Sequence, residues 1–311
     1  MNITLIGHIC NDIIHYPDGT ESQSYGGIYY SLATLANVAD NNTLILPVFG
    51  IGAKDYDGFI DHLKIYSNID TSGIYKINGP TNRVNLFYSD KQTRVECSEN
   101  IAPQIPFKKI KPYLDTNMVL INMISGFDIA LETLDEIRMV AREENIPVYM
   151  DLHSLSLGVN EDGKRYRRPL MNWRRWLFML HAVQMNEEEA RGLTLEKYDE
   201  GNLVKQVTAL NTDNVIITRG SGGCTVYHDE HKQIHREDFV GENIERAVDS
   251  TGCGDVFAAA YCAKYLRSHD EAESVKFANQ VAAFNASLKG IESIAGMSEF
   301  RVTVNKKVNG E

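Results

Sequence analysis

A glycine-rich turn near the C-terminal end of the sequence holds the residues with the clearest potential for chemistry: residues 249–255 read Asp-Ser-Thr-Gly-Cys-Gly-Asp. Apolar residues follow at 256, 257, 260 and 261, and this spacing predicts a helix that begins where the turn ends. Gly252 and Gly254 let the backbone approach a ligand, and the helix N-terminus adds partial positive charge. Asp255 stands at the rim, where it can accept a proton from an attacking hydroxyl. The alternative is an ordinary glycine turn in which Asp255 caps the helix.

The elements that must position this turn alternate along the chain. Short β-branched runs are separated by segments with helical periodicity, and this order predicts a mostly parallel sheet covered by helices on both faces. Two long helical patterns, 256–267 and 271–287, close the chain. The predicted strands are 3–6, 43–48, 118–122, 147–151, 183–185 and 214–218, and the predicted helices between them are 28–38, 56–66, 130–144, 187–192 and 203–210.

One segment breaks this alternation. Residues 82–89 and 92–97 are typical of two strands around the turn Asp90-Lys91, which predicts a β-hairpin. With residues 13–25 this hairpin would form a small β lid, so we expect one domain, 1–311, with lid segments at about 13–25 and 74–100. Because a two-stranded hairpin is marginal alone, the lid is also where a homodimer contact would form.

Composition excludes several function classes. The chain of 311 residues is 43% hydrophobic, has no apolar run of membrane-spanning length and begins without a basic n-region, so we expect neither a membrane segment nor a signal peptide. Its five scattered cysteines favour a reducing cytoplasm over a disulfide framework. The net charge of −11 argues against nucleic acid or anionic membranes as partners. A phosphate-handling site would therefore need local positive potential from helix N-termini, Mg²⁺ and a few cationic side chains.

Six segments in order resemble the motifs of one known family. Residues 249–255 are similar to the D-T-x-G-A-G-D signature of the ribokinase-like (PfkB) carbohydrate kinase family, and residues 26–33 resemble its G-G-x-x-x-N-x-A segment. Each motif is weak alone, but six in order across nearly the whole chain are specific. The resemblance implies a ribokinase-like three-layer α/β/α sandwich with a mostly parallel central sheet and a small β lid. The six segments are 7–12, 26–33, 48–58, 186–189, 218–223 and 249–255.

The resemblance also implies roles at the site of phosphoryl transfer. Asp255 would take the proton from the acceptor hydroxyl, and the backbone amides of Gly252, Cys253 and Gly254 would form the anion hole for the transferring group. Cys253 stands where the family has alanine. A thiol at a helix N-terminus is expected to be more acidic than a free cysteine, although a small buried residue in place of alanine is an equal alternative.

ATP and Mg²⁺ are the cofactors that the resemblance implies. Asn186 and Glu189, one helical turn apart, would organise Mg²⁺ largely through water, and their alternative role is to cap the start of a helix. A monovalent cation such as K⁺ would bind near Asp249, Thr251 and residues 287–293. The loop at 218–223 would bind the nucleotide, or would form a plain hairpin that leads into 224–227. The implied nucleotide-binding residues are Thr218, Gly220, Gly223 and Asn279.

The acceptor side shows departures from the family pattern. Asp12 would bind substrate hydroxyls, Gly26 and Gly27 would let the substrate lie against backbone, and Ser31 replaces the family's asparagine. Residues 151–155 read Asp-Leu-His-Ser-Leu in place of D-x-N-x-R, so we expect an acceptor without a phosphate group. Lid arginines remain as an alternative phosphate contact, and the basic run 164–175 is expected to be a solvated loop and helix face. The lid arginines are Arg83 and Arg94.

These features favour an ATP-dependent phosphotransferase that moves the γ-phosphoryl group to a hydroxyl of a small sugar or polyol. An inositol or nucleoside kinase of the same family is one alternative, and a non-catalytic ligand-binding regulator on the same fold is another. A nicotinamide dehydrogenase is disfavoured because no G-x-G-x-x-G follows the first strand. A P-loop NTPase is disfavoured because G-x-x-x-x-G-K-[ST] is absent.

Overall fold

The central sheet is built around strands whose side chains are buried on both faces. β1 (Asn2–Ile6) lies between β8 (Met118–Asn122) and β4 (Leu44–Gly52), and all three run parallel. Every residue of β8 is buried, as expected for a parallel strand covered on both sides. The computed structural model describes residues 1–88, 94–231, 233–242 and 249–288. Within these residues the sheet has nine strands in the order β15-β14-β13-β12-β9-β8-β1-β4-β5.

The two ends of the sheet differ in strand direction. β9, β12 and β13 continue the parallel part, whereas β14 is antiparallel to β13 and β15 is antiparallel to β14. β5 extends the other edge in parallel with β4. The bounds of these strands are β5 (Ile74–Ile77), β9 (Val148–Asp151), β12 (Ala182–Asn186), β13 (Asn214–Thr218), β14 (Gly223–Glu230) and β15 (Gln233–Val240).

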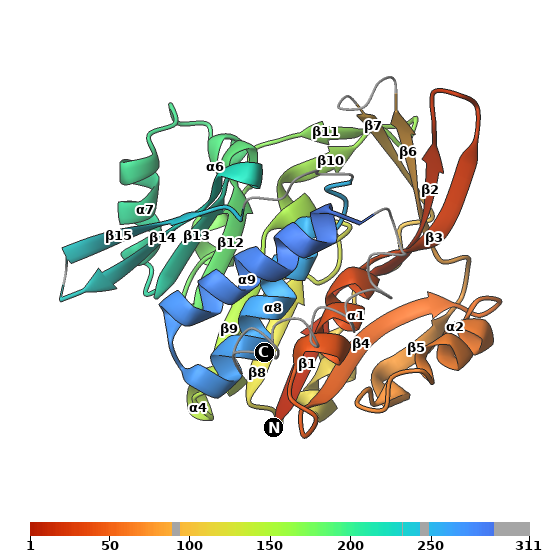
Figure 1. The fold of residues 1–311 in the computed structure, drawn as a ribbon, viewed down its shortest axis with the longest axis horizontal. Helices are drawn as coiled ribbons and strands as arrows, with labels where there is room; N and C mark the ends of the chain where they lie inside the picture. Colours follow the sequence, from red (N-terminus) through yellow and green to blue (C-terminus); the bar gives the residue numbers. More distant parts are fainter. Residues whose placement is uncertain (89–93, 232, 243–248, 289–311) are drawn as a thin grey trace, which may run out of the picture.

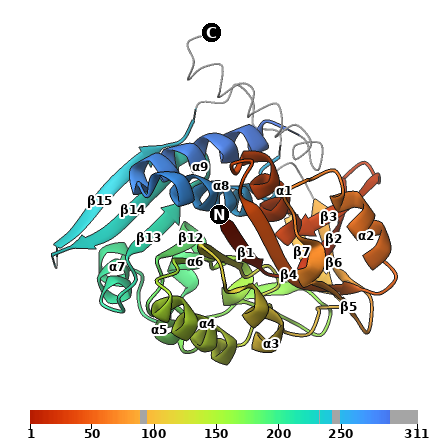
Figure 2. The same ribbon diagram turned by 90° about the horizontal axis from the view of Figure 1, so that it is seen from below.

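Helices form a layer on each face of the sheet. Figure 2 shows α1, α8 and α9 above the sheet and α3, α4, α5 and α7 below it. α8 is buried along most of its length because it lies between the sheet and its neighbours α1 and α9. This arrangement confirms the predicted three layers. The helices are α1 (Ile28–Val38), α2 (Tyr56–Leu63), α3 (Phe107–Ile110), α4 (Leu131–Glu143), α5 (Trp173–Trp176), α6 (Glu187–Gly192), α7 (Glu200–Thr208), α8 (Cys253–Ser268) and α9 (Glu271–Ala286).

A small separate sheet lies beside the carboxyl ends of the central strands (Figure 1). Its four strands are in the order β3-β2-β6-β7, with β2 parallel to β6 and the other pairs antiparallel. The β6–β7 pairing confirms the predicted hairpin, whose turn at 89–93 lies outside the described residues. The strands are β2 (Ile9–His15), β3 (Glu21–Gly27), β6 (Asn82–Tyr88) and β7 (Arg94–Glu99).

Some element boundaries differ from the prediction. α8 begins at Cys253 rather than at residue 256, because Gly252 takes a left-handed conformation (φ 74°) that starts the helix inside the glycine turn. α2 ends at Leu63 rather than at 66. The short hairpin β10 (Leu157–Val159) and β11 (Arg165–Arg167) was not predicted, since three-residue strands leave no periodicity to detect. None of the helices in the described part of the chain has the length and apolar character to cross a membrane.

Candidate active site

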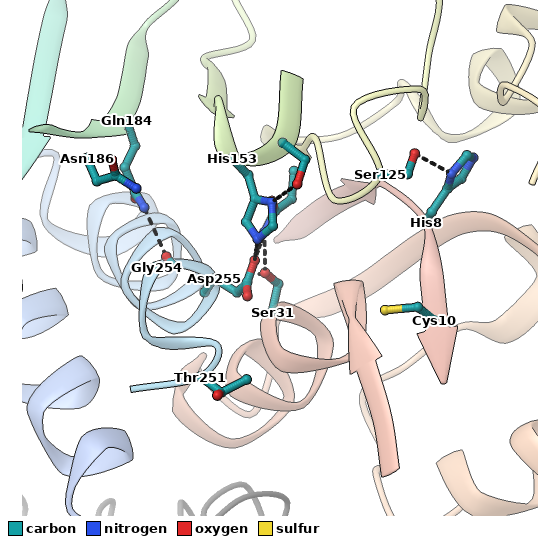
Figure 3. A network of polar contacts seen from close by, with 12 residues as sticks. His8, Cys10, Ser31, Ser125, His153, Gln184, Asn186, Thr251, Gly254 and Asp255 are labelled. Carbon is teal, nitrogen blue, oxygen red and sulfur yellow. Dashed lines mark hydrogen bonds and ion pairs between the residues drawn. The ribbon is translucent and has the colours of Figure 1, made fainter. Parts of the chain in front are cut away.

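The N-terminus of α8 places Asp255 at the centre of the candidate site (Figure 3). Because α8 starts at Cys253, Asp255 lies in the first helical turn, and it is only 4% exposed. The turn is tightly packed: a Cβ atom at Gly252 would lie 2.3 Å from a ring carbon of Tyr30. Glycine at 252 is therefore required both by its backbone conformation and by its contact with the aromatic ring.

A buried hydrogen-bond network holds Asp255 in place. Asn122, the last residue of β8, donates from Nδ2 to Oδ1 of Asp255 at 2.7 Å and to Oγ of Ser31 at 3.1 Å. Ser31 in turn donates to the backbone carbonyl of Asp255 at 3.1 Å. His153 approaches the same Oδ1, with Nε2 at 3.9 Å (Figure 3). The carboxylate is thus held by the end of β8 and the segment after β9, and its backbone carbonyl by α1, a helix in the same layer as α8.

The charges around Asp255 are coupled. Burial raises the pKa of Asp255, while the charge of His153 and the hydrogen bond from Asn122 offset part of this rise. Burial lowers the pKa of His153, but the carboxylates of Asp255, Asp151 and Glu189 outweigh it and raise the pKa above its usual value. The charged form of His153 is therefore favoured relative to that of a free histidine. When protonated, it would supply local positive charge in a chain whose net charge is −11.

Of the three backbone amides that are predicted to form the anion hole, one already donates a hydrogen bond and two remain available to an anion. The N–H of Cys253 donates to the carbonyl of Ser250 at 3.2 Å. The N–H groups of Gly252 and Gly254 have no acceptor among the described residues. This is the usual state of the first turn of a helix, and it leaves donors for an anion.

A side chain that the sequence reasoning missed fixes the peptide beside this hole. Gln184 on β12 donates from Nε2 to the carbonyl of Gly254 at 3.0 Å, and Tyr149 on β9 donates to Oε1 of Gln184 at 2.7 Å. Both residues belong to neighbouring parallel strands that lie under α8. In the sequence, the signal for these two residues was a polar side chain within a predicted strand that is otherwise apolar.

The thiol of Cys253 is less acidic than expected. Burial raises its pKa to about 11, although a hydrogen bond from Nδ2 of Asn285 at 3.3 Å opposes the rise. Its Sγ also lies 3.5 Å from the carbonyl of Ala282. The expected effect of the helix N-terminus is therefore outweighed by desolvation, and the structure corrects that expectation.

Asp12 and the two glycines of β3, which are predicted to bind the acceptor, lie together in the small sheet. Asp12 is buried, and Cys10 donates from its thiol to Oδ1 of Asp12 at 3.2 Å. A Cβ atom at Gly26 would lie 2.0 Å from Oδ2 of Asp12, so only glycine leaves room for this carboxylate. Gly27 has a positive φ of 60° and ends β3 directly before α1. Ser31, on α1, is fully buried and lies within the Asp255 network described above.

Asn186 and Glu189 form a reciprocal capping box at the start of α6. Glu189 accepts from the backbone and side-chain nitrogens of Asn186 at 2.8 and 2.7 Å, and its own N–H donates to Oδ1 of Asn186 at 2.8 Å. The helix-capping alternative is therefore confirmed. Burial raises the pKa of Glu189. The pKa of Asp151 is also raised, first by burial and then by the negative charges of Glu189 and Asp255. These carboxylates gather close to the N-terminus of α8.

The predicted nucleotide loop follows β13. Thr218 ends this strand, and Gly220 and Gly223 have positive φ angles of 56° and 90°. A Cβ atom at Gly223 would lie 2.0 Å from the carbonyl oxygen of Phe239 on β15, so this glycine is required by the antiparallel hairpin itself. Asn279, on α9, lies with Nδ2 3.7 Å from Sγ of Cys224 on β14. The loop and α9 thus meet at the same end of the sheet.

Two expectations about basic residues change. Arg83 is about half exposed and pairs with Glu99 at 3.6 Å, on the face of the small sheet opposite to Asp12, so it does not face the acceptor side. The side chain of Arg94 lies outside the described residues. In the basic run 164–175, the side chain of Arg165 is only 5% exposed. The run is therefore not simply a solvated face.

The expected monovalent-cation loop is described in part. The N–H of Thr251 donates to Oδ1 of Asp249 at 2.9 Å, and Nδ2 of Asn285 donates to the carbonyl of Thr251 at 3.1 Å. Residues 289–293 of this expected site lie outside the described residues.

Comparisons with known proteins agree with this geometry. A cytidine kinase from Thermococcus kodakarensis is 25% identical over 280 residues, which cover 89% of this chain and 92% of the relative. Arabidopsis thaliana ribokinase, complexed with ribose and ATP, has a TM-score of 0.72 at 15% identity, over 95% of this chain and 98% of that one. A pyrophosphate-dependent kinase of the ribokinase family, complexed with a pyrophosphate analog and myo-inositol, has a TM-score of 0.73 at 17% identity, over 94% and 99%.

The match to a family model covers almost the whole chain. Residues 2–295 match the pfkB family carbohydrate kinases. This range includes every strand and helix described above, and both the glycine turn and the small sheet. The protein therefore belongs to the pfkB family of carbohydrate kinases, which are phosphotransferases with an alcohol group as acceptor.

Proposed function

We propose that the protein transfers the γ-phosphoryl group of ATP to a hydroxyl of a small, neutral sugar or polyol, with Asp255 as the general base. The observation that carries this proposal is the carboxylate of Asp255, which is buried in the first turn of α8 and held at Oδ1 by Asn122. Free amide donors at the same helix terminus provide for the developing charge. Asp12 supplies a second carboxylate for acceptor hydroxyls.

The contacts of Asp255 suggest how the proton moves. Among the described residues, the side chains of Asn122 and His153 both approach Oδ1, so Oδ2 is the oxygen offered to the acceptor. The acceptor hydroxyl gives its proton to Oδ2 as its oxygen attacks the γ-phosphorus, and the bond from phosphorus to the bridging oxygen of ADP breaks. Gly252 and Gly254 donate to the transferring group, and His153, whose raised pKa favours its charged form, limits the build-up of negative charge when protonated.

The carboxylates beside α8 fit a magnesium ion. Oδ2 of Asp151 is buried without a hydrogen-bond partner among the described residues, and like charges contribute to the raised pKa values of Asp151 and Glu189. We propose that Asn186 and Glu189 hold Mg²⁺ through water, which neutralises the donor phosphates. A K⁺ ion near Asp249 and Thr251 is a separate proposal, tested by activity in K⁺ against Na⁺ buffers.

The identity of donor and acceptor is best tested together. We would mix the protein with Mg-ATP or Mg-pyrophosphate and with pentoses, hexoses, inositols, nucleosides or phosphosugars, and detect phosphorylated product by mass spectrometry. We expect product with ATP and a neutral polyol, and none with the Asp255→Asn variant. Product only with a nucleoside or an inositol would select those family alternatives, and product only with pyrophosphate would overturn the donor. Ligand binding without any product would favour the regulatory alternative.

We also propose a cytoplasmic location and a homodimer, each supported by one observation. The five cysteines are all free, which supports a reducing cytoplasmic environment. Phe87 and Val95 are directly paired on the outer face of the small sheet, and both are exposed. We propose that this face forms a homodimer contact. Sedimentation equilibrium of the wild type and of Phe87→Asp tests it, and a wild-type monomer at micromolar concentration would contradict it.

A further inference from the structure

The inner face of the small sheet carries a carboxylate besides that of Asp12. Directly paired residues of neighbouring strands point to the same face of a sheet. The pairings Asp12–Val84 and Val84–Ser98 form one such row, and Ile14–Leu86 and Leu86–Glu96 form the next. Glu96 therefore lies on the same face as Asp12, one row along and two strands across, which corresponds to roughly 7 Å along the strands and roughly 10 Å across them.

The ion-pair geometry of Glu96 places its carboxylate on this inner face, because Oε1 lies 3.7 Å from Nε of Arg165, which also donates to Ser98. The pKa of Cys10 is raised mainly by burial and by the neighbouring Asp12, and the charge of Glu96 adds to this rise. The charge of Glu96 also helps to raise the pKa of His153, which burial alone would lower. Cys10 lies beside Asp12, and His153 lies beside Asp255. The carboxylate of Glu96 thus acts on both ends of the acceptor side, and its side chain is still 25% exposed.

Arg165 connects this face to the central sheet. It donates from Nε to Oγ of Ser98 at 2.8 Å and from Nη1 to the carbonyl of Ser125 at 2.7 Å, just after β8. The backbone adds two links, because Ser98 N–H donates to the carbonyl of Gly163 at 2.8 Å and Cys97 pairs with Lys164. A buried guanidinium is costly to place without partners, so these bonds fix the position of β7.

Glu96 is not simply the counter-ion of Arg165. Its Oε1 lies 3.7 Å from Nε of Arg165, beyond hydrogen-bond distance, and that Nε already donates to Ser98. The carboxylate therefore keeps acceptor capacity for another donor. Glu99, three residues further along β7, faces the other side of the sheet and pairs with Arg83 instead.

We propose that Glu96 is a further acceptor-binding residue, which accepts hydrogen bonds from acceptor hydroxyls opposite Asp12, and that Arg165 is the positioning residue that holds β7 over the acceptor. This inference rests on the proposed kinase function and deepens it. Three carboxylates, those of Asp12, Glu96 and Asp255, would face the acceptor, and this favours a molecule without negative charge that carries hydroxyl groups on several sides. An anionic acceptor would meet like charge from each of them.

Steady-state kinetics test the role of Glu96. The acceptor probe is whichever of ribose, myo-inositol and cytidine the wild type phosphorylates best. We expect Glu96→Gln to raise the KM for this acceptor about 10- to 100-fold, as for a lost hydrogen bond to a charged group, with an unchanged KM for the donor. Glu99→Gln, on the outer face of the same strand, is the matched control and should behave as the wild type. An unchanged acceptor KM in Glu96→Gln would overturn its role.

Hydrogen exchange tests Arg165 without any ligand. We expect Arg165→Met to increase amide exchange in residues 94–99 of the otherwise folded protein, and Arg165→Lys, which keeps the charge but loses the two-directional donors, to give a smaller increase. Unchanged exchange in Arg165→Met would overturn the positioning role. A wild type that neither phosphorylates nor binds any of the three probes would overturn the proposed function and the role of Glu96, whereas the exchange result would still decide on Arg165.

Discussion

Around Asp255 the candidate site is made of buried side chains that hydrogen-bond to one another, whereas at the loop after β13 it is made of backbone flanked by ion pairs near the surface. Asp255 is 4% exposed and shares its network with Asn122 and Ser31. Arg219, beside Thr218, is 23% exposed and pairs with Glu187 and with Glu200. In a buried network each partner is costly to lose, while exposed pairs contribute little. The acceptor half is thus expected to be sensitive to substitution and the donor half tolerant.

The largest effect is expected from Asp255→Asn. Loss of the base should lower kcat by about 10²- to 10⁴-fold, with little change in donor binding. The raised pKa of Asp255 means that the folded state disfavours its charged form, so a neutral amide should leave the melting temperature equal or higher. Turnover and thermal unfolding are measured on the same sample. Turnover within tenfold of the wild type would remove Asp255 as the base.

The glycine turn offers a matched pair of substitutions. Gly252→Ala combines a φ of 74° with a Cβ 2.3 Å from the Tyr30 ring, so we expect a stability loss of about 1–3 kcal/mol and a marked fall in kcat. The Cβ of Gly254→Ala would meet its first neighbour, Nε2 of Gln184, only at 3.5 Å, so stability should be near that of the wild type. Urea unfolding compares the two variants. Equal stabilities would show that the turn relaxes freely.

Asn122 should set the acidic limb of the pH–rate profile. The base acts when it is deprotonated, so activity falls as the pH drops through the pKa of Asp255. The hydrogen bond from Asn122 lowers that pKa, and Asn122→Leu should therefore shift the acidic limb of kcat upward by about 1–2 pH units. Ser31→Ala keeps the Asn122 donor and should leave the limb in place. If the acidic limb of the Asn122→Leu profile did not shift, the hydrogen bond between Asn122 and Asp255 would not form during turnover.

The glycine turn and the parallel order of the sheet could be predicted because both leave local signals. Residue 252 needs a glycine, and strands such as β8 are buried over their whole length and mostly apolar. The partners of Asp255 could not be predicted in the same way. Asn122 lies 133 positions away in the sequence and reaches Asp255 only because β8 passes beneath α8. Sheet order alone brings such residues together.

Burial is the other property that local patterns did not show. The expectation of an acidic Cys253 considered the helix terminus but not the depth of the thiol, which decides the direction of its pKa. Arg165 stands in a basic run that resembles a solvated surface, yet the hairpin β10–β11 folds it against β7. In both cases the decisive contacts come from segments that are distant in the sequence.

The smallest effect is expected from Arg219→Met in the donor half. Arg219 donates to Glu187 at 2.5 Å, to Glu200 at 2.6 Å and to Thr225 at 3.0 Å. The two ion pairs are partly exposed, and the buried Thr225 keeps its hydrogen bond to Asp238, so the loss of these contacts should cost only about 1 kcal/mol of stability. The donor KM should stay within about threefold, since the proposed nucleotide loop would bind through backbone that the hairpin β13–β14 holds independently of this side chain. Donor titrations and urea unfolding of the variant measure both. A tenfold rise in the donor KM at unchanged stability would show that Arg219 itself contacts the donor. It would then no longer hold that the acceptor half of the site depends on side chains whereas the donor half depends on backbone.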